Sequence, residues 1–294
     1  MRLTTACFWL GGMYLVLGIV PAALMQVELF AAGNVLPSDF QATLFSIGQK
    51  LHRSALLFGA PMALVSGLGM AIFAEARGQV GGVVLGWIAL VVSVFLVILG
   101  TLNTPSGTIE QVFFGRLSDG AAAIVVSLAG VGVCLTIYAD RTARVSRLAY
   151  AMLGALMLVG AIGLSRLVGR DGHALLGETY LVIAAQHALG VALVLWAFAV
   201  MTAWAARKGQ APETWVSVVL AIGLFGAGAQ MVRWTMGLGL AGFPYGMTDY
   251  PSSFEPAQRQ IGLWAFVFLT FLVAASWRTW RLSRQVPPSP AEVF

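Results

Sequence analysis

Charged residues are scarce in this sequence. They make up 10% of the 294 residues, whereas hydrophobic residues make up 59%. A soluble globular protein carries about 25% charged residues, so the composition excludes a water-soluble enzyme. Intrinsic disorder is excluded as well, because it requires low hydrophobicity and high charge. The net charge of +5 does not indicate nucleic-acid binding, since arginines at membrane boundaries explain it.

Cysteine and histidine are scarce too. The two cysteines, Cys7 and Cys134, both lie within apolar runs, so we interpret them as packing residues and exclude a disulfide framework. The three histidines are His52, His173 and His187. So few histidines limit the number of histidine-ligated centres that the chain can form.

Long apolar runs are abundant. A membrane-spanning helix needs about 20 apolar residues, and these runs are too long and too uniform for barrel strands. The sequence therefore predicts an all-α, polytopic membrane helix bundle with eight transmembrane helices, forming a single unit over 1–284. The eight segments are 7–31, 41–74, 80–102, 120–139, 147–168, 176–205, 213–240 and 258–280.

The basic residues predict how these helices are oriented. On one side of the membrane lie Arg2, Arg77, Arg141, Arg144, Arg147, Arg207, Lys208, Arg278, Arg281 and Arg284. On the other lie Lys50, Arg53, Arg116, Arg166, Arg170, Arg233 and Arg259, diluted by most of the acidic residues. The first side should be cytoplasmic, so both termini lie inside, and residues 285–294 form a flexible cytoplasmic tail.

His52 and His187 lie within apolar segments. An ionisable residue at membrane depth suggests a functional site, although each could instead be a neutral histidine bonded to a backbone carbonyl or a neighbouring helix. Segments 41–74 and 176–205 both run inward from the outer face, and each histidine lies about one to three turns from that face. Two imidazoles at one depth on different helices can ligate a haem from both sides.

Four blocks of residues resemble one known family, the catalytic subunit of haem–copper oxidases. They are Glu178-Thr179-Tyr180-Leu181-Val182-Ile183-Ala184-Ala185-Gln186-His187; Leu238-Gly239-Leu240-Ala241-Gly242-Phe243-Pro244 followed by Asp249-Tyr250-Pro251; His52 with Gly67-Leu68-Gly69; and Glu28-Leu29. The resemblance implies that His52 and His187 are the axial ligands of a low-spin haem.

The departures from that family are equally informative. An oxygen-reducing subunit needs six histidines for its two haems and its copper, and this chain has three. Ala185 stands where the family has the ligand of the second haem. The resemblance therefore implies one low-spin haem, no copper and no oxygen reduction by the chain itself. Gln26 replaces the family's arginine that faces the haem A formyl group, which favours haem b, and Tyr245 and Gly246 replace its propionate-binding arginines.

Two other arginines are candidates for contacts with haem propionates. Arg233 lies near the outer end of its segment beside Trp234, and Arg53 follows His52. A planar guanidinium matches a carboxylate in a fork geometry. The alternative for each is an arginine that extends from the membrane boundary toward water.

A six-coordinate haem leaves electron transfer as the expected task. We expect a cytochrome b-type subunit of a membrane redox complex in the bacterial inner membrane, with its haem nearer the periplasmic face. Its expected partners are other subunits, a periplasmic c-type cytochrome or dehydrogenase, and either another carrier or quinone. The alternative is a haem-free structural anchor or assembly subunit of a respiratory complex. A haem A synthase would need two histidine pairs, and a transporter site would need broken helices with intramembrane acids.

Overall fold

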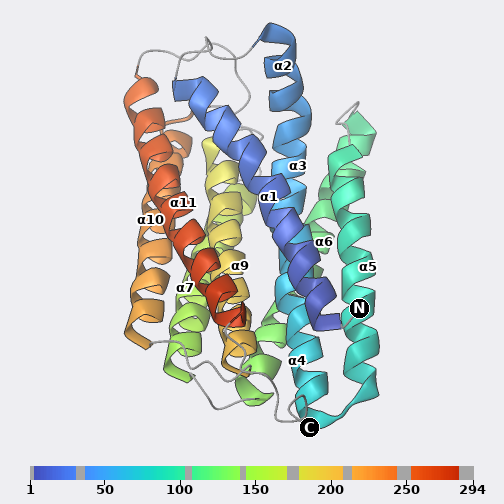
Figure 1. Ribbon diagram of the computed structural model, residues 1–294. Coiled ribbons are helices and arrows are strands. Elements are labelled where there is room, and N and C mark those ends of the chain that lie inside the picture. Colours follow the sequence, from blue (N-terminus) through green and yellow to red (C-terminus); the bar gives the residue numbers. More distant parts are fainter. Residues whose placement is uncertain are drawn as a thin grey trace. The chain divides into compact units, whose positions relative to one another are not determined.

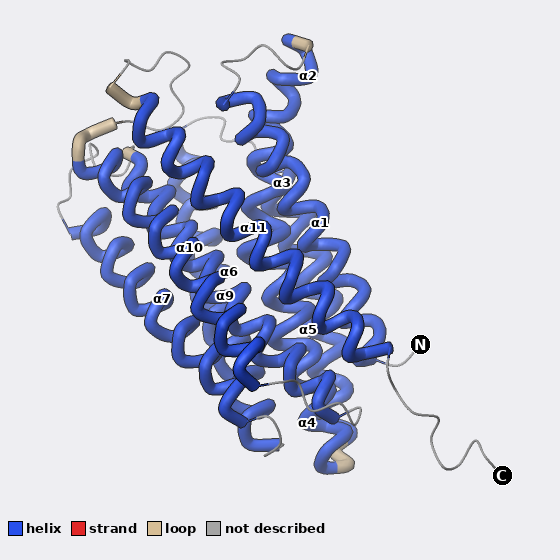
Figure 2. Tube along the Cα trace, turned by 60° about the vertical axis from the view of Figure 1, so that its left-hand side comes forward, coloured by secondary structure: helices blue, strands red, loops and turns tan. Residues whose placement is uncertain are grey.

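The structure is a computed structural model that describes residues 3–30, 37–102, 108–139, 144–170, 179–207, 214–243 and 253–284. Helices make up nearly all of these residues, and no strand occurs among them (Figures 1 and 2). The all-α prediction is therefore confirmed. The chain divides into two compact units, Met1–Arg141 and Thr142–Phe294, which we call unit 1 and unit 2.

Unit 1 contains four long helical segments. They are α1 (Leu3–Phe30), a continuous helical segment 38–77, α5 (Val80–Leu102) and α6 (Thr108–Ala139). We call the second of these the 38–77 helix. Its parts are α2 (Ser38–Thr43), η1 (Leu44–Gly48), α3 (Gln49–Ser54), η2 (Ala55–Gly59), η3 (Pro61–Gly67) and α4 (Leu68–Arg77).

The 38–77 helix is the centre of unit 1. It packs against α1, α5 and α6, and 89% of the residues in the most apolar 18-residue stretch of the span Gln49–Arg77 are buried. Glycines permit the closest approach: a Cβ atom at Gly132 of α6 would lie 2.4 Å from the backbone oxygen of Val65, and one at Gly69 would lie 2.7 Å from the oxygen of Gly132. Backbone packed against backbone fixes this part of the helix.

Three parts of the 38–77 helix, η1, η2 and η3, are π-helical. π-Helical turns are rare and occur often at functional sites. Pro61 begins η3 and supplies a local reason for it, because proline has no N–H to donate to the preceding turn. Between η1 and η2 lies α3, which carries His52.

Unit 2 contains α7 (Arg144–Arg170), α9 (Tyr180–Arg207), α10 (Thr214–Leu240) and α11 (Glu255–Arg284). Helix α9 packs against the other three, and 89% of the residues in the most apolar 18-residue stretch of the span Tyr180–Ala206 are buried. The Trp196 indole N–H donates a hydrogen bond of 3.1 Å to the backbone oxygen of Ala151, which joins α9 to α7. Helix α9 is therefore the centre of unit 2.

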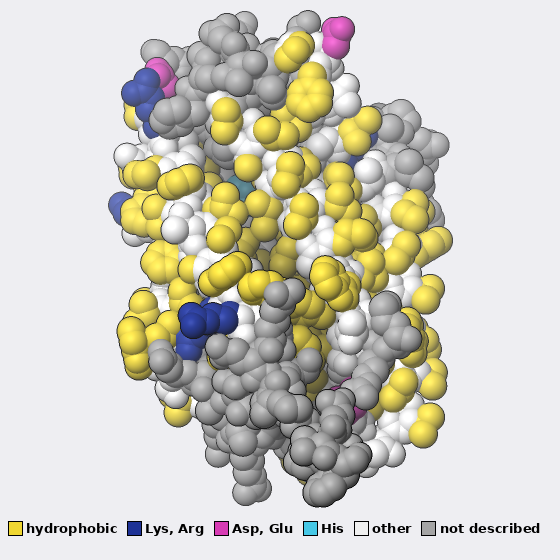
Figure 3. Space-filling view, in the orientation of Figure 1, with side chains coloured by type: hydrophobic (Ala, Val, Ile, Leu, Met, Phe, Trp, Pro, Cys, Tyr) yellow, Lys and Arg dark blue, Asp and Glu magenta, His cyan; other side chains and the backbone are white. Residues whose placement is uncertain are grey.

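Seven helices in the described part of the chain are long and apolar enough to cross a membrane. Each of the eight predicted segments contains a long helix in its described residues, but the described part of the segment 120–139 forms a shorter apolar helix, Ala123–Tyr138, and is not one of the seven. Its helix, α6, begins at residue 108, 12 residues before the predicted start. Figure 3 shows many hydrophobic side chains on the viewed surface of the described residues, as expected of helices that face lipid. Seven helices compatible with a membrane helix bundle are therefore shown, and the count of eight stays a prediction.

The structure also tests the predicted packing role of the two cysteines and leaves three other predictions about the fold untested. The packing role is right for Cys7, which is buried, and wrong for Cys134, whose side chain is exposed. The tail 285–294 lies outside the described residues. The single unit over 1–284 and the cytoplasmic position of both termini stay predictions.

Candidate functional site

His52 lies half-buried on α3. Its Nδ1 atom lies 2.7 Å from the backbone oxygen of Gly18 on α1. Since a carbonyl oxygen only accepts hydrogen bonds, Nδ1 is the donor and Nε2 of the neutral ring keeps its lone pair. A purely structural histidine could make the same bond. The bond also matches a metal ligand, because such histidines usually donate their other ring N–H to a carbonyl or carboxylate.

The contact between α1 and the 38–77 helix depends on Gly18. A Cβ atom at this position would lie 2.5 Å from Cγ of Leu56, so any side chain would have to displace the Leu56 side chain or the helix that carries it. Pro21 lies inside α1 and removes one of the hydrogen bonds of the adjacent turn. Its Cβ atom would be 3.3 Å from a Cβ atom at Gly48, one turn before His52. The sequence therefore allows α1 to approach on both sides of the histidine.

Polar contacts also join the 38–77 helix to α5 near His52. The hydroxyl oxygens of Ser54 and Thr101 lie 3.0 Å apart, and Ser54 also donates to the backbone oxygen of Lys50. Farther along, a hydrogen bond of 3.2 Å links Tyr14 of α1 to Ser93 of α5. These bonds fix the register of the three helices around the histidine.

His187 is half-buried on α9, and its Nδ1 atom is buried. The neighbouring side chains are small or moderate in size and apolar: Ala184, Ala188 and Val191 are all buried. Ala185, which stands where the oxidase family has a second haem ligand, is also buried and apolar. His52 belongs to unit 1 and His187 to unit 2, so their pairing on one haem stays a prediction.

The start of α9 is anchored to the end of α10. Gly242 has a left-handed conformation, with φ +80°. Its N–H bonds to the oxygen of Gly239, and the N–H of Phe243 bonds to the oxygen of Leu238, which together form a Schellman cap. The oxygen of Phe243 then accepts a hydrogen bond of 3.1 Å from the N–H of Tyr180, the first residue of α9.

Aromatic packing strengthens this anchor. The centre of the Phe254 ring lies 5.5 Å from the centre of the Tyr180 ring and 5.7 Å from the centre of the Phe243 ring. Phe254 is buried together with Leu238 and Ile261. Two of the blocks that resemble the oxidase family, those around Tyr180 and around Leu238, thus meet at one end of unit 2. Sequence reasoning identified both blocks but missed this contact.

Both candidate arginines for propionate contacts are exposed. The guanidinium of Arg233 lies 5.7 Å from the centre of the Trp234 ring and donates a hydrogen bond of 3.4 Å to the Gln230 side chain. Arg53 directly follows His52 on α3. His173, Tyr245 and Gly246 lie outside the described residues, as do the side chains of Gln26, Glu28 and Leu29.

Within the described ranges, no three His, Cys, Asp or Glu side chains are grouped so that they could hold a metal ion. A haem held by two histidines does not need such a group. Comparison with models of known protein families and with curated proteins finds no match to the chain.

Proposed function

We propose that this protein is a membrane cytochrome b-type electron-transfer subunit that holds one low-spin haem b between His52 and His187. The observation that carries the proposal is the hydrogen bond from His52 Nδ1 to the oxygen of Gly18. It directs the proton to Nδ1 and leaves Nε2 as the atom that can bind iron. The four blocks that resemble the catalytic subunit of haem–copper oxidases support it.

The residues around both histidines fit a flat macrocycle. Ala55 and Gly59 follow His52 by about one and two turns, and Ala184 and Val191 lie one turn on either side of His187. Their small or apolar side chains suit an apolar ring system between helices. A haem bound there would supply a reversible one-electron carrier with no open coordination position. The chain's own contribution is to orient the imidazoles and to exclude water.

The expected surroundings follow from the positions of the histidines and the arginines. With the arginine-rich side in the cytoplasm of a bacterium, both histidines lie in the periplasmic half of the inner membrane. The haem then exchanges electrons with two partners. One is a periplasmic c-type cytochrome or dehydrogenase, and the other is another subunit or a quinone. Arg233 and Arg53 are the candidates to bind the propionates.

The test is a reduced-minus-oxidised absorption spectrum of the purified protein, with pyridine haemochrome typing. We expect about one haem b per chain and a low-spin spectrum that carbon monoxide leaves unchanged. His52→Ala and His187→Ala should each abolish or strongly reduce haem binding. His173→Ala is the matched control, because His173 lies outside the apolar segments, and it should retain full haem content. Unchanged haem content in either of the first two variants would overturn the assignment.

The alternative is a haem-free anchor or assembly subunit. Its support is that Tyr245 and Gly246 replace the family's propionate-binding arginines, while the Schellman cap and the Phe254 packing explain the block around Leu238 without a cofactor. A folded protein that is isolated without haem, and that takes up none when haem is added, would favour this alternative.

A further inference from the structure

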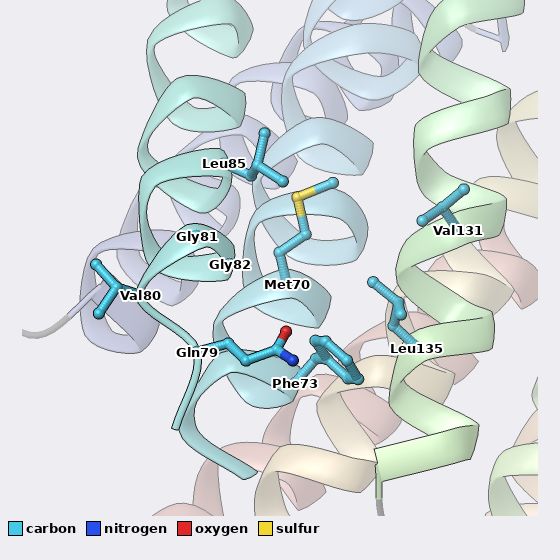
Figure 4. A pocket seen from close by; sticks show the side chains of 9 residues that line it. All are labelled: Met70, Phe73, Gln79, Val80, Gly81, Gly82, Leu85, Val131 and Leu135. Atoms are coloured by element: carbon cyan, nitrogen blue, oxygen red, sulfur yellow. The ribbon is translucent and has the colours of Figure 1, made fainter. Parts of the chain in front are cut away.

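Unit 1 contains a groove that the electron-transfer proposal does not use. Helices α4, α5 and α6 enclose it near the 78–79 turn, and its volume is about 510 Å³. Its walls include Met70 and Phe73 of α4 and Val131 and Leu135 of α6, which face one another across the opening (Figure 4). This volume is typical of sites for small molecules, which range over about 300–1,000 Å³.

The walls are almost entirely apolar. The polar side chain that contributes to them is Gln79, whose amide group lies beside Phe73 at one end of the groove (Figure 4). Gly82 allows α5 to pack closely against α4, because a Cβ atom there would lie 2.8 Å from Cβ of Ala74. The groove therefore suits a long apolar group with a polar group at one end.

The position of the groove indicates what surrounds it. One span ends at Arg77 and the next begins at Val80, so the turn between them marks a membrane boundary. From that boundary the groove extends about 10 Å along α4 to Met70. Val84 and Leu85 on the adjoining surface of α5 are both 53% exposed, as expected of side chains in contact with lipid. An acyl chain is therefore the apolar group available to fill the groove.

A cation lies at the polar end. Arg77 follows Phe73 by four residues and Tyr138 follows Leu135 by three, so both continue the faces that line the groove. The guanidinium of Arg77 lies 4.9 Å from the centre of the Tyr138 ring, and the side chain is exposed. Glu75 is two positions earlier and thus lies on another side of α4. A guanidinium with exposed N–H groups beside the Gln79 amide suits a phosphate group.

We propose that this groove binds an anionic phospholipid of the leaflet on the Arg77 side, with one acyl chain between α4, α5 and α6 and the phosphate at Arg77 and Gln79. A quinone fits less well, because Gln79 is the one polar side chain among the described residues that line the groove. Met70 is also 18 residues from His52, or about 27 Å along the helix, so the groove lies at the end of the 38–77 helix away from the histidine.

The test is native mass spectrometry of the full-length protein in detergent, with phosphatidylglycerol and phosphatidylcholine of identical chains added in turn. We expect phosphatidylglycerol to bind more tightly, and Arg77→Gln to weaken it about fivefold. Arg281→Gln removes an exposed arginine from unit 2 and should leave the affinity unchanged. Equal affinity for the two lipids, or equal effects of the two variants, would overturn the role of Arg77.

A second pair of variants tests the groove itself. Val131→Trp places a bulky ring in the wall and should displace the lipid, whereas Ile124→Trp, two turns away on an exposed part of the same helix face, should not. A phosphatidylglycerol with a photoreactive acyl chain should label Met70, Phe73 or Leu135. Labelling spread evenly over the exposed face of α5 would overturn the site, and so would labelling by a photoreactive quinone in place of the lipid.

Discussion

The 38–77 helix and α9 occupy the same place in their two units and are built differently. Each is the second long helix of its unit, each packs against the other three, and 89% of the residues in the most apolar 18-residue stretch of each are buried. In the corresponding stretches of the other five spans, 17–39% of the residues are buried. The two histidines in apolar segments lie on these two central helices, each half-buried and ahead of the most buried stretch of its helix.

The two helices differ in how their histidines are positioned. The 38–77 helix has π-helical turns on both sides of α3, and His52 is bonded directly to the oxygen of Gly18 on a neighbouring helix. Helix α9 is α-helical throughout its length. Its start is capped by Thr179 and bonded to the oxygen of Phe243, two turns before His187. The ring of His52 is therefore bonded to a neighbouring helix, and His187 lies two turns from the anchored end of its own helix.

The largest expected effect concerns the anchor of α9. A Cβ atom at Gly239 would lie 2.3 Å from the backbone N of Leu181, so Gly239→Ala must push α9 away from α10. We expect a loss of about 1–3 kcal/mol in the free energy of unfolding, measured by denaturant titration in detergent. Gly237→Ala, on the same helix with open space around it, should cost nothing or add up to about 1 kcal/mol. Equal losses in both variants would mean that this contact does not anchor α9.

A smaller effect is expected at the ring of His52. Gly18→Ala brings a methyl group against the flexible Leu56 side chain, so we expect a destabilisation of about 1 kcal/mol. The specific effect should be a longer hydrogen bond from His52 Nδ1. With three histidines in the chain, nuclear magnetic resonance of ¹⁵N-histidine-labelled protein can follow it: faster exchange of the Nδ1 proton is expected.

The matched control for that experiment is Gly12→Ala. Position 12 is also on α1 but has no atom near a new Cβ, so the His52 signal should remain as in the unchanged protein. If Gly12→Ala speeds exchange of the His52 Nδ1 proton as much as Gly18→Ala does, the bond to Gly18 does not control that exchange. This readout needs no haem, so it separates the geometry of His52 from the proposed cofactor.

Hydropathy was sufficient to predict most of the fold. Each of the eight apolar segments contains a long helix in its described residues, because a long apolar run in a membrane can satisfy its backbone only as a helix. The same signal could not locate the start of α6. Its first 12 residues include Glu110, Arg116 and Asp119, and hydropathy reports contact with lipid rather than backbone conformation.

The candidate site was only partly predictable. His52 and His187 stand out because ionisable residues are rare in apolar segments. The bond to Gly18 does not stand out, since every residue has a backbone oxygen and the chain has 34 glycines. The π-helical turns around α3 have no periodicity that a sequence reveals, and Pro61 is a local signal only for η3, farther along the helix. Contacts between helices decide such features, and a sequence does not state which helices touch.

The smallest expected effect concerns the bond between Ser54 and Thr101, two residues from His52. Their hydroxyl oxygens lie 3.0 Å apart, and each also lies within hydrogen-bond distance of a carbonyl of its own helix, at Lys50 and Val97, so one hydroxyl donates to the other while the other donates to its own helix. Because these bonds satisfy the hydroxyls when the partner is removed, a double-mutant cycle of Ser54→Ala and Thr101→Val should give a coupling energy near 0.6 kcal/mol. A coupling energy near zero would mean that the Ser54–Thr101 bond does not fix the register of the helices. The register would then depend on the bond of His52 to Gly18 and on helix packing. A much larger coupling, about 2 kcal/mol or more, would show that unit 1 holds its central helix by polar contacts on two sides, unlike the end-anchored α9.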